Sequence, residues 1–495
     1  MQHATALLRS APCISLRAFT SAKRPGSRAG LHVRAAVASK TATPRLVLKG
    51  GKVHLFSRHR NPVVYGGAVD NIKGPAPALG DAVLVCDGAG AAFAWGFYNP
   101  HSMYRVRIMQ MLSSPEQKAP SDIQALLRAK IQAAWELRRA LDLPSQDTDV
   151  YRLVNSEGDG LSGLIIDVLG SQVVVAPSAA WCMRYRAEIT RALTEVLQQQ
   201  GTAGGAEPVI VWQPAVTMLT REEGWTFDDP GAAGVQGVAT NGARSRAASG
   251  EDSGEEEEGD AGEDAETDSA ASPASPADPP LIIREHGLRY SLDAEGPNQK
   301  TGFYADQRDS RLVLRQLSKG KRVLDLCCYT GGFALNAAAG GATHVLGLDS
   351  SHRAVHAAAA NAALNGLDQV LTFERQDMKA WGRGSQPPPG GWDLVVLDPP
   401  KLAPGKKAMV RATRQYTAYN AAAMRLVAPG GLLMTCSCSG AMTQSDGFLP
   451  MLQDAARLAG RSLTLLRSAG AAPDHPLDPG YPEGRYLTNV LVRVT

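Results

Sequence analysis

Short apolar runs typical of β-strands dominate the chain between positions 45 and 111. Two of these runs, residues 82–86 and 92–97, flank Asp87-Gly88-Ala89-Gly90, a sequence typical of the turn between antiparallel strands. This pattern predicts a small β-barrel. In the segment that follows, apolar residues recur at helical spacing, so one helix is expected over residues 121–142.

Short strand-like runs return in the next part of the chain, at residues 150–154, 163–168 and 173–175. A segment with helical spacing follows at 184–199, and the apolar run 209–212 predicts a further strand. Strands and helix together predict a compact α+β middle domain.

Strand and helix patterns alternate regularly from Leu281 onward, which is typical of a doubly wound α/β fold. Five apolar runs predict its strands: residues 322–326, 344–348, 370–375, 394–397 and 432–435. The run Tyr329-Thr330-Gly331-Gly332-Phe333 follows the first strand and precedes an Ala-rich helix. Its glycines let the backbone approach a ligand at the carboxyl end of the strand, where open α/β sheets bind ligands.

Polar residues recur where the later strands end. Asp349 follows the second strand, where a carboxylate accepts hydrogen bonds from ribose hydroxyls, and Asp377 follows the third, near the place for an adenine amino group. The strict GxGxxG spacing of nicotinamide dehydrogenases is missing, which argues against that class of enzyme. These positions indicate a nucleoside cofactor of another kind.

The segment Asp398-Pro399-Pro400-Lys401 follows the fourth strand. Two prolines remove backbone donors and stiffen a turn, which suits a pocket for a flat base. Enzymes that act on a base commonly extrude it into such a pocket. The alternative interpretation is a proline turn at the start of a helix, with Asp398 as its cap.

The first 43 residues contain seven Lys and Arg residues and no acid, and the first acid of the whole chain is Asp70. Because the segment is also rich in Ala and Ser, residues 1–43 are predicted to be an organellar transit peptide. The chloroplast is the favoured destination and the mitochondrion the alternative. A merely disordered tail is the other interpretation of the same composition.

Residues 231–280 contain twelve acids, two Arg and no Leu, Ile, Met, Cys or aromatic residue. Such a segment cannot bury enough apolar surface to offset the entropy of ordering it, so it is predicted to be a disordered acidic insert. A regulatory or RNA-mimicking role is the alternative. The net charge of the whole chain is +3, but the residues outside segments 1–43 and 231–280 are mildly basic on their own. Such a charge is compatible with RNA binding.

Other bulk properties narrow the classes of protein further. No run approaches the roughly 18 apolar residues of a membrane helix, so no membrane span is expected. The seven Cys residues include no pair of CxxC motifs, so reduced thiols and no metal site are expected. The sequence leaves the oligomeric state open.

Several motifs together resemble those of the bacterial large-subunit ribosomal RNA cytosine-5 methyltransferases. They are residues 300–311, 329–333, 398–401, 437–440 and 474–476. The resemblance runs from about Leu46 to the C-terminus, apart from the acidic insert. It implies a PUA-like RNA-binding β-barrel at 45–115, a helix plus α+β middle domain at 116–230, and a Rossmann-like class I methyltransferase domain at 281–495, within the α/β class.

The resemblance also implies S-adenosylmethionine as cofactor and ribosomal RNA as substrate. Cofactor contacts are expected from Gln307, Tyr329, Thr330, Gly331, Asp349, Asp377 and Asp398. Cys438 matches the family's Ser-Cys-Ser-Gly motif and is the expected nucleophile, with Cys436 as the alternative.

Cytosine carbon 5 requires such a thiol because it is a poor nucleophile. Attack of a thiolate on carbon 6 makes carbon 5 enamine-like, which divides a difficult substitution into easier covalent steps. Asp398 is expected to hydrogen-bond or protonate ring nitrogen 3. Lys401 or water is expected to remove the carbon 5 proton.

Three other functions compete with this hypothesis. A Rossmann-fold methyltransferase acting on another RNA base or on a protein starts from a lone pair and needs no thiol. A non-catalytic RNA-binding ribosome-assembly factor should lack the cofactor loop, Asp398 or Cys438, and this chain has all three. Aminopropyl transfer on the same fold gains nothing from an N-terminal RNA-binding barrel.

Overall fold

The computed structural model describes most of the chain beyond the predicted transit peptide. The described residues are 43–114, 117, 119, 122–200, 208–227, 280–292, 302–378, 389–403 and 405–495. Apart from Thr43 and Pro280, the predicted transit peptide and acidic insert lie outside these residues. The segment Ala42–Thr495 forms one compact unit, and its three successive parts are described in turn.

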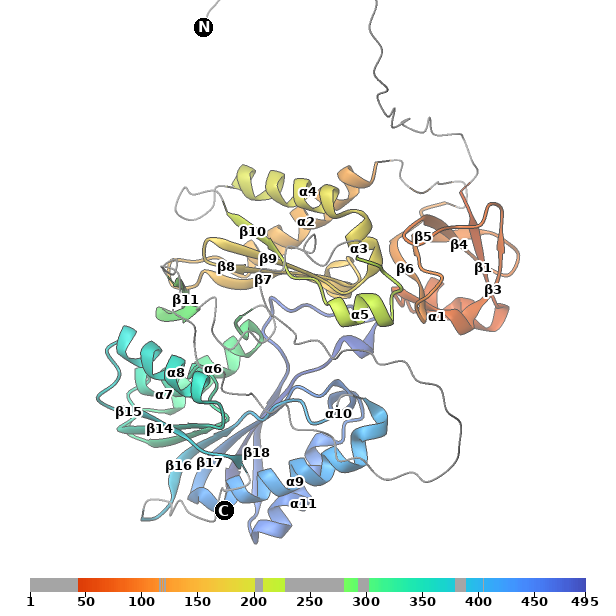
Figure 1. The fold of residues 1–495 in the computed structure, drawn as a ribbon. Helices are drawn as coiled ribbons and strands as arrows, with labels where there is room; N and C mark the ends of the chain where they lie inside the picture. Colours follow the sequence, from red (N-terminus) through yellow and green to blue (C-terminus); the bar gives the residue numbers. More distant parts are fainter. Residues whose placement is uncertain are drawn as a thin grey trace, which may run out of the picture. The chain divides into compact units, whose positions relative to one another are not determined.

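The N-terminal part, residues 43–114, is a six-stranded sheet with the spatial order β2-β6-β5-β4-β1-β3 (Figure 1). Its strands are β1 (Arg45–Leu48), β2 (Val63–Tyr65), β3 (Val69–Lys73), β4 (Ala82–Cys86), β5 (Ala92–Tyr98) and β6 (Tyr104–Met111), with the short helix α1 (Val53–Ser57) and the 3-10 turns η1 (Gly50–Lys52) and η2 (Gly66–Ala68). β4 and β5 pair antiparallel, and the N–H of Gly90 donates to the carbonyl of Asp87 at 2.9 Å. The predicted turn at residues 87–90 is therefore confirmed.

The middle part, residues 122–227, packs helices on a four-stranded sheet with the order β10-β9-β8-β7. Its elements are α2 (Ile123–Ala140), β7 (Val150–Asn155), η3 (Ser156–Asp159), β8 (Leu164–Leu169), β9 (Gln172–Pro177), α3 (Ala180–Arg184), α4 (Arg186–Gln200), β10 (Val209–Trp212) and α5 (Val216–Arg221). Asp122 caps α2, since its side chain accepts from the N–H of Ala125 at 3.0 Å. The predicted helix at 184–199 corresponds to α4, which α3 precedes.

The C-terminal part, residues 280–495, contains a hairpin and a seven-stranded sheet with the order β15-β14-β13-β16-β17-β19-β18. The hairpin and strands are β11 (Leu281–Glu285), β12 (Leu288–Leu292), β13 (Arg322–Leu326), β14 (His344–Asp349), β15 (Leu371–Arg375), β16 (Trp392–Leu397), β17 (Val427–Ser437), β18 (Leu463–Ala469) and β19 (Thr488–Val494). The helices are η4 (Ala305–Gln307), α6 (Arg308–Leu317), α7 (Gly332–Ala339), α8 (His352–Leu364), η6 (Lys406–Ala408), α9 (Met409–Leu426), α10 (Gly440–Gln444), α11 (Phe448–Ala459) and η7 (Pro482–Gly484).

Two hydrophobic cores lie on opposite faces of this sheet. Helices α6, α7 and α8 cover one face, and α9 and α11 cover the other (Figure 1). The five strands β13 to β17 pair in parallel, so the predicted doubly wound arrangement is confirmed.

The antiparallel pair β18 and β19 had no counterpart among the predicted strands. β19 pairs Asn489 with Cys436 and Thr488 with Ser437. Because this partner strand extends β17, Cys436 and Ser437 lie inside the strand and not in the loop after it. Among the described residues, no helix is both long and apolar enough to span a membrane.

Candidate active site

The loop between β13 and α7 has a tightly curled backbone. Cys327, Tyr329 and Gly331 have positive φ angles of 62°, 49° and 86°. A Cβ atom on Gly331 would lie 2.9 Å from Cζ of Phe373, so a side chain at this position would displace the ring beneath the loop. The glycine is thus needed for both the backbone angle and the close packing.

Asp349, at the end of β14, holds this loop in place. Its two carboxylate oxygens accept from the N–H groups of Tyr329 and Ser351, each at 2.9 Å. On the other side of the loop, Nδ2 of Asn361 donates to the carbonyl of Thr330 at 3.1 Å. Each carboxylate oxygen keeps acceptor capacity for a further donor.

Asp377 lies two residues beyond β15, and its side chain is exposed. The N–H of Gln376 donates to the carbonyl of Asp349 at 2.8 Å, so the ends of β14 and β15 lie side by side. The structure therefore brings Asp377 to the same edge of the sheet as Asp349.

Asp398 leaves the sheet at the end of β16 and contacts a residue from another element. Nε2 of Gln307 donates to its Oδ2 at 3.3 Å. Gln307 is buried, and its Oε1 has no hydrogen-bond partner among the described residues. Lys401 is exposed in the loop after Asp398.

Cys438 lies in the loop after β17, and its side chain is partly exposed. Both neighbours are fully buried, and the hydroxyl of Tyr416 on α9 lies 3.0 Å from Oγ of Ser437 and 2.9 Å from Oγ of Ser439. Oγ of Ser439 also accepts from the N–H of Ala403 at 3.1 Å, which ties this loop to the one that carries Asp398. The backbone on either side of Cys438 is thus fixed.

Cys436 has a different environment. It is fully buried in β17, and its Sγ accepts from Nδ2 of Asn489 at 3.0 Å. Burial, reinforced by the charge of Asp398, raises the pKa of the Cys436 thiol well above its usual range. The two thiols therefore differ in access: Cys438 is partly exposed and Cys436 is fully buried.

Tyr304 is a site residue to which the sequence analysis gave no role. Its ring meets that of Tyr329 edge-on, with the centroids 5.4 Å apart. Burial raises the pKa of its hydroxyl, and the charges of Tyr329, Asp306, Cys438 and Asp398 add to the shift. Its place in the motif at residues 300–311, three positions before Gln307, was the available signal.

The catalytic half of the chain matches a known family. Residues 267–481 match the S-adenosylmethionine-dependent methyltransferase model, and residues 47–110 match a PUA-like domain. The ribosomal RNA large subunit methyltransferase I of Erwinia tasmaniensis is 34% identical over 455 residues, which is 91% of this chain and 100% of that protein. This chain belongs to the same family.

A second relative supports that assignment, and one solved structure shares the fold. The protein of the same name from Salmonella enteritidis is 33% identical over 453 residues, covering 91% of this chain and 98% of its own. The crystal structure of the methyltransferase SMU.776 in complex with SAH superposes with a TM-score of 0.65 at 17% identity, covering 91% of this chain and 99% of that one. The second similarity concerns the fold, and it confirms the predicted Rossmann-like domain.

The residues of this methyltransferase fit its cofactor, S-adenosylmethionine. The orphaned Oε1 of Gln307 is a buried acceptor that a ligand donor would satisfy, and such unsatisfied groups cost free energy. Asp349 offers charged acceptors beside a loop that lets backbone approach closely, as a ribose requires. Within the described residues, no three His, Cys, Asp or Glu side chains gather as metal ligands do.

Proposed function

We propose that this methyltransferase modifies carbon 5 of a cytosine in organellar large-subunit ribosomal RNA, through a covalent bond between Cys438 and the base. The observation that carries the proposal is the paired loop geometry. β16 and β17 pair Leu397 with Thr435, so Asp398 and Cys438 leave the sheet from neighbouring strand ends. A thiol and a carboxylate on adjacent, mutually bonded loops are the groups this chemistry needs.

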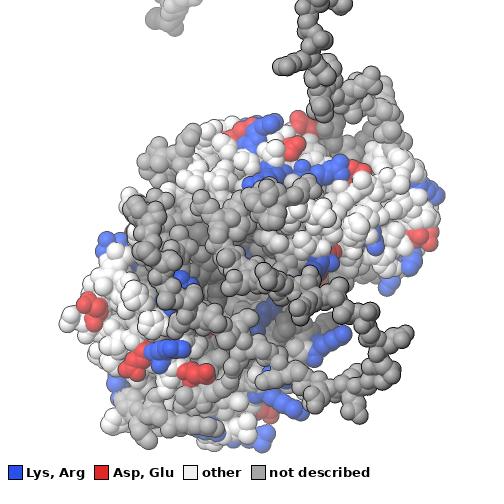
Figure 2. Space-filling model, viewed as in Figure 1, with Lys and Arg blue, Asp and Glu red and all other residues white. Residues whose placement is uncertain are grey.

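Support for an RNA substrate comes from the family and from surface charge. The relatives are named as enzymes of large-subunit ribosomal RNA. Figure 2 shows several Lys and Arg side chains along the outer edge of the N-terminal part, and over the helices of the middle part it shows Lys and Arg with Asp and Glu among them. Positive surface charge favours binding to the phosphate backbone.

Each side chain has a defined task in the proposed reaction. The Cys438 thiolate adds to carbon 6, and Asp398 hydrogen-bonds or protonates ring nitrogen 3, which stabilises the electron-rich ring. S-adenosylmethionine, when bound, supplies an electrophilic methyl group to carbon 5. Lys401 or a water molecule then takes the carbon 5 proton, and the bond from Sγ to carbon 6 breaks to release the thiolate.

The contrast between the two thiols supports Cys438 over Cys436. A nucleophile must reach its substrate and exist as a thiolate. Cys438 is partly exposed, whereas Cys436 is fully buried, and that burial raises the pKa of its thiol well above the usual range.

A trapping experiment tests the proposal. Target RNA carrying 5-fluorocytosine should form a denaturant-resistant adduct in the presence of S-adenosylmethionine, because fluorine cannot leave carbon 5 as a cation. Cys438→Ala should abolish both the adduct and methylation. Cys436→Ala should retain both at a reduced rate, since it changes the packing of β17 and not the nucleophile.

Two outcomes would contradict the proposal. An adduct formed by Cys438→Ala would move the role to Cys436 or another thiol. Full methylation by the double variant Cys436→Ala/Cys438→Ala would overturn carbon 5 chemistry and favour a methyltransferase that attacks through a lone pair.

We also propose that residues 1–43 direct import into the chloroplast, with the mitochondrion as the alternative. This segment lies outside the described residues apart from Thr43, and its support is compositional: seven basic residues and no acid. A fluorescent protein fused behind residues 1–43 should enter the organelle. Retention of the fusion in the cytosol would contradict the proposal.

A further inference from the structure

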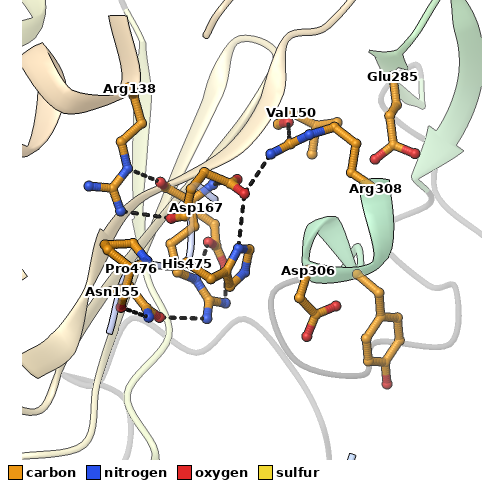
Figure 3. A network of polar contacts seen from close by, with 12 residues as sticks. Arg138, Val150, Asn155, Asp167, Glu285, Asp306, Arg308, His475 and Pro476 are labelled. Atoms are coloured by element: carbon orange, nitrogen blue, oxygen red, sulfur yellow. Dashed lines mark hydrogen bonds and ion pairs between the residues drawn. The ribbon is translucent and has the colours of Figure 1, made fainter. Parts of the chain in front are cut away.

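The loop between β18 and β19, residues 470–487, contains the motif Asp474-His475-Pro476. This motif is one of those that carry the family resemblance, yet it has no task in the proposed reaction. Its backbone and side chains contact residues from the middle part and from the start of the catalytic part (Figure 3).

On the catalytic side, the loop binds both neighbours of Gln307. The N–H of Ala472 donates to the carbonyl of Asp306 at 2.8 Å, and the hydroxyl of Tyr486 donates to Oδ2 of Asp306 at 2.7 Å. Oδ1 of Asp474 pairs with Nη2 of Arg308 at 2.5 Å. Gln307 is thus held between two residues that the same loop fixes.

On the other side, Asp474 is bonded to the middle part of the chain. Its Oδ2 accepts from the N–H of Arg152 at 2.9 Å, and its carbonyl accepts from Nη2 of Arg138 at 2.7 Å. Nη1 of Arg308 donates to the carbonyl of Val150 at 3.0 Å. Figure 3 shows Arg138 and Arg308 converging from different elements on the segment that carries His475 and Pro476.

The carboxylate of Asp474 is ionised in this setting. It is fully buried, which by itself would raise its pKa, but the hydrogen bonds and charges of His475 and Arg308 hold that pKa well below its usual range. If one partner of a buried ion pair moves away, the other is left as an uncompensated buried charge. The pair of Asp474 and Arg308 therefore holds the two side chains together.

We propose that Asp474 is a positioning residue that sets Gln307 against Asp398 in the cofactor pocket, by holding Arg308 to the edge of β7. The inference rests on the proposed assignment of Gln307 and Asp398 to cofactor binding. The Gln307 to Asp398 hydrogen bond is long at 3.3 Å, so a small displacement of the segment around Arg308 breaks it.

The test uses the full chain and calorimetric titration with S-adenosylmethionine. Gln307→Ala and Asp474→Asn should each weaken binding about tenfold, the effect of losing one hydrogen bond to a charged group. Tyr486→Phe removes the hydroxyl that donates to Asp306, the other neighbour of Gln307, and should weaken binding a few-fold. The double variant Gln307→Ala/Asp474→Asn should bind no more weakly than Gln307→Ala, because both changes act on one contact.

Glu223→Gln is the matched control. Glu223 is also a buried acid paired with a buried arginine, since its Oε1 lies 2.8 Å from Nη2 of Arg107, but it joins the N-terminal and middle parts. The affinity of the Glu223→Gln variant for S-adenosylmethionine should stay within twofold of the affinity of the unchanged protein. In the cofactor-free protein, hydrogen exchange at residues 308–311 should quicken in Asp474→Asn and not in Glu223→Gln.

The outcomes separate this inference from the proposed function. Unchanged affinity in Gln307→Ala would remove Gln307 from the pocket and overturn the positioning role, while the reaction proposed for Cys438 would still be decided by the trapping experiment. Weak binding by Gln307→Ala with unchanged binding by Asp474→Asn would overturn the positioning role alone. If Asp474→Asn does not fold, Arg308→Lys, which changes the other partner of the same ion pair, decides in its place. Equal weakening in the Glu223→Gln control, or additive losses in the double variant, would show a merely structural role.

Discussion

Asp349 illustrates how one side chain organises the loop that surrounds it. Its side-chain oxygens accept from the N–H of Tyr329 across the loop and from the N–H of Ser351 behind it. The same oxygens remain able to accept from a ligand. A single charge therefore supports the shape of the site and its affinity.

Asp349→Asn should weaken S-adenosylmethionine binding by about 1.5–3 kcal/mol, the value of hydrogen bonds to a charged group, while leaving RNA binding intact. Calorimetry with cofactor and a filter-binding assay with RNA measure the two effects. Asp368→Asn, at an exposed position outside the loop, is the control and should change neither. Cofactor affinity that stays the same in Asp349→Asn would remove this residue from the site.

At the scale of elements, the position of Cys438 depends on the contact between α9 and the end of β17. Tyr416 is fully buried on α9, and its hydroxyl lies between the hydroxyls of Ser437 and Ser439. The loop that carries the thiol is thereby fastened to a helix as well as to the sheet. Buried hydroxyls that lose their partners destabilise the fold.

Tyr416→Phe should lower the free energy of unfolding by about 1–2 kcal/mol, because Ser437 and Ser439 lose a shared partner. It should also slow adduct formation with 5-fluorocytosine RNA, since the loop around Cys438 loosens. Urea denaturation and adduct kinetics measure these changes. Tyr290→Phe, which removes a buried hydroxyl bonded to Asn336, should leave adduct kinetics unchanged; equal kinetics in both variants would contradict the fastening role.

At the scale of the whole described unit, residues 470–487 pass close to the middle part. A Cβ atom on Gly158 would lie 1.9 Å from the carbonyl oxygen of Pro476, so backbone meets backbone without room for a methyl group. The hydrogen bond from Nδ2 of Asn155 to that same carbonyl, at 2.8 Å, fixes the approach. Because the two backbones are closely packed, a shift of one at this contact must also move the other.

Gly158→Ala should therefore destabilise the protein by about 1–3 kcal/mol, as overpacking does where neighbours cannot move. Gly50→Ala is the control, because no atom lies within 4 Å of the Cβ it would add. Thermal and urea unfolding compare the two variants. Equal stability of the Gly158→Ala and Gly50→Ala variants would show that the backbone at Gly158 and Pro476 can move apart at little cost in free energy.

The amino-acid sequence by itself determined the local elements and the positions of most candidate residues. The turn at residues 87–90, the helix α2, the five parallel strands and the sites at Asp349 and Asp398 follow from periodicity, turn residues and motif spacing. These features depend on neighbours within a few positions of the chain. The roles of the residues in the site remain predictions.

Only the tertiary structure decided which of these residues meet. The antiparallel β19 placed Cys436 inside a strand while leaving Cys438 partly exposed, and neither thiol's surroundings can be deduced from the spacing between them. Arg138 and Asp474 are bonded although 336 positions separate them. Periodicity carries no information about such contacts, because they depend on how the sheets and helices pack and not on the local sequence.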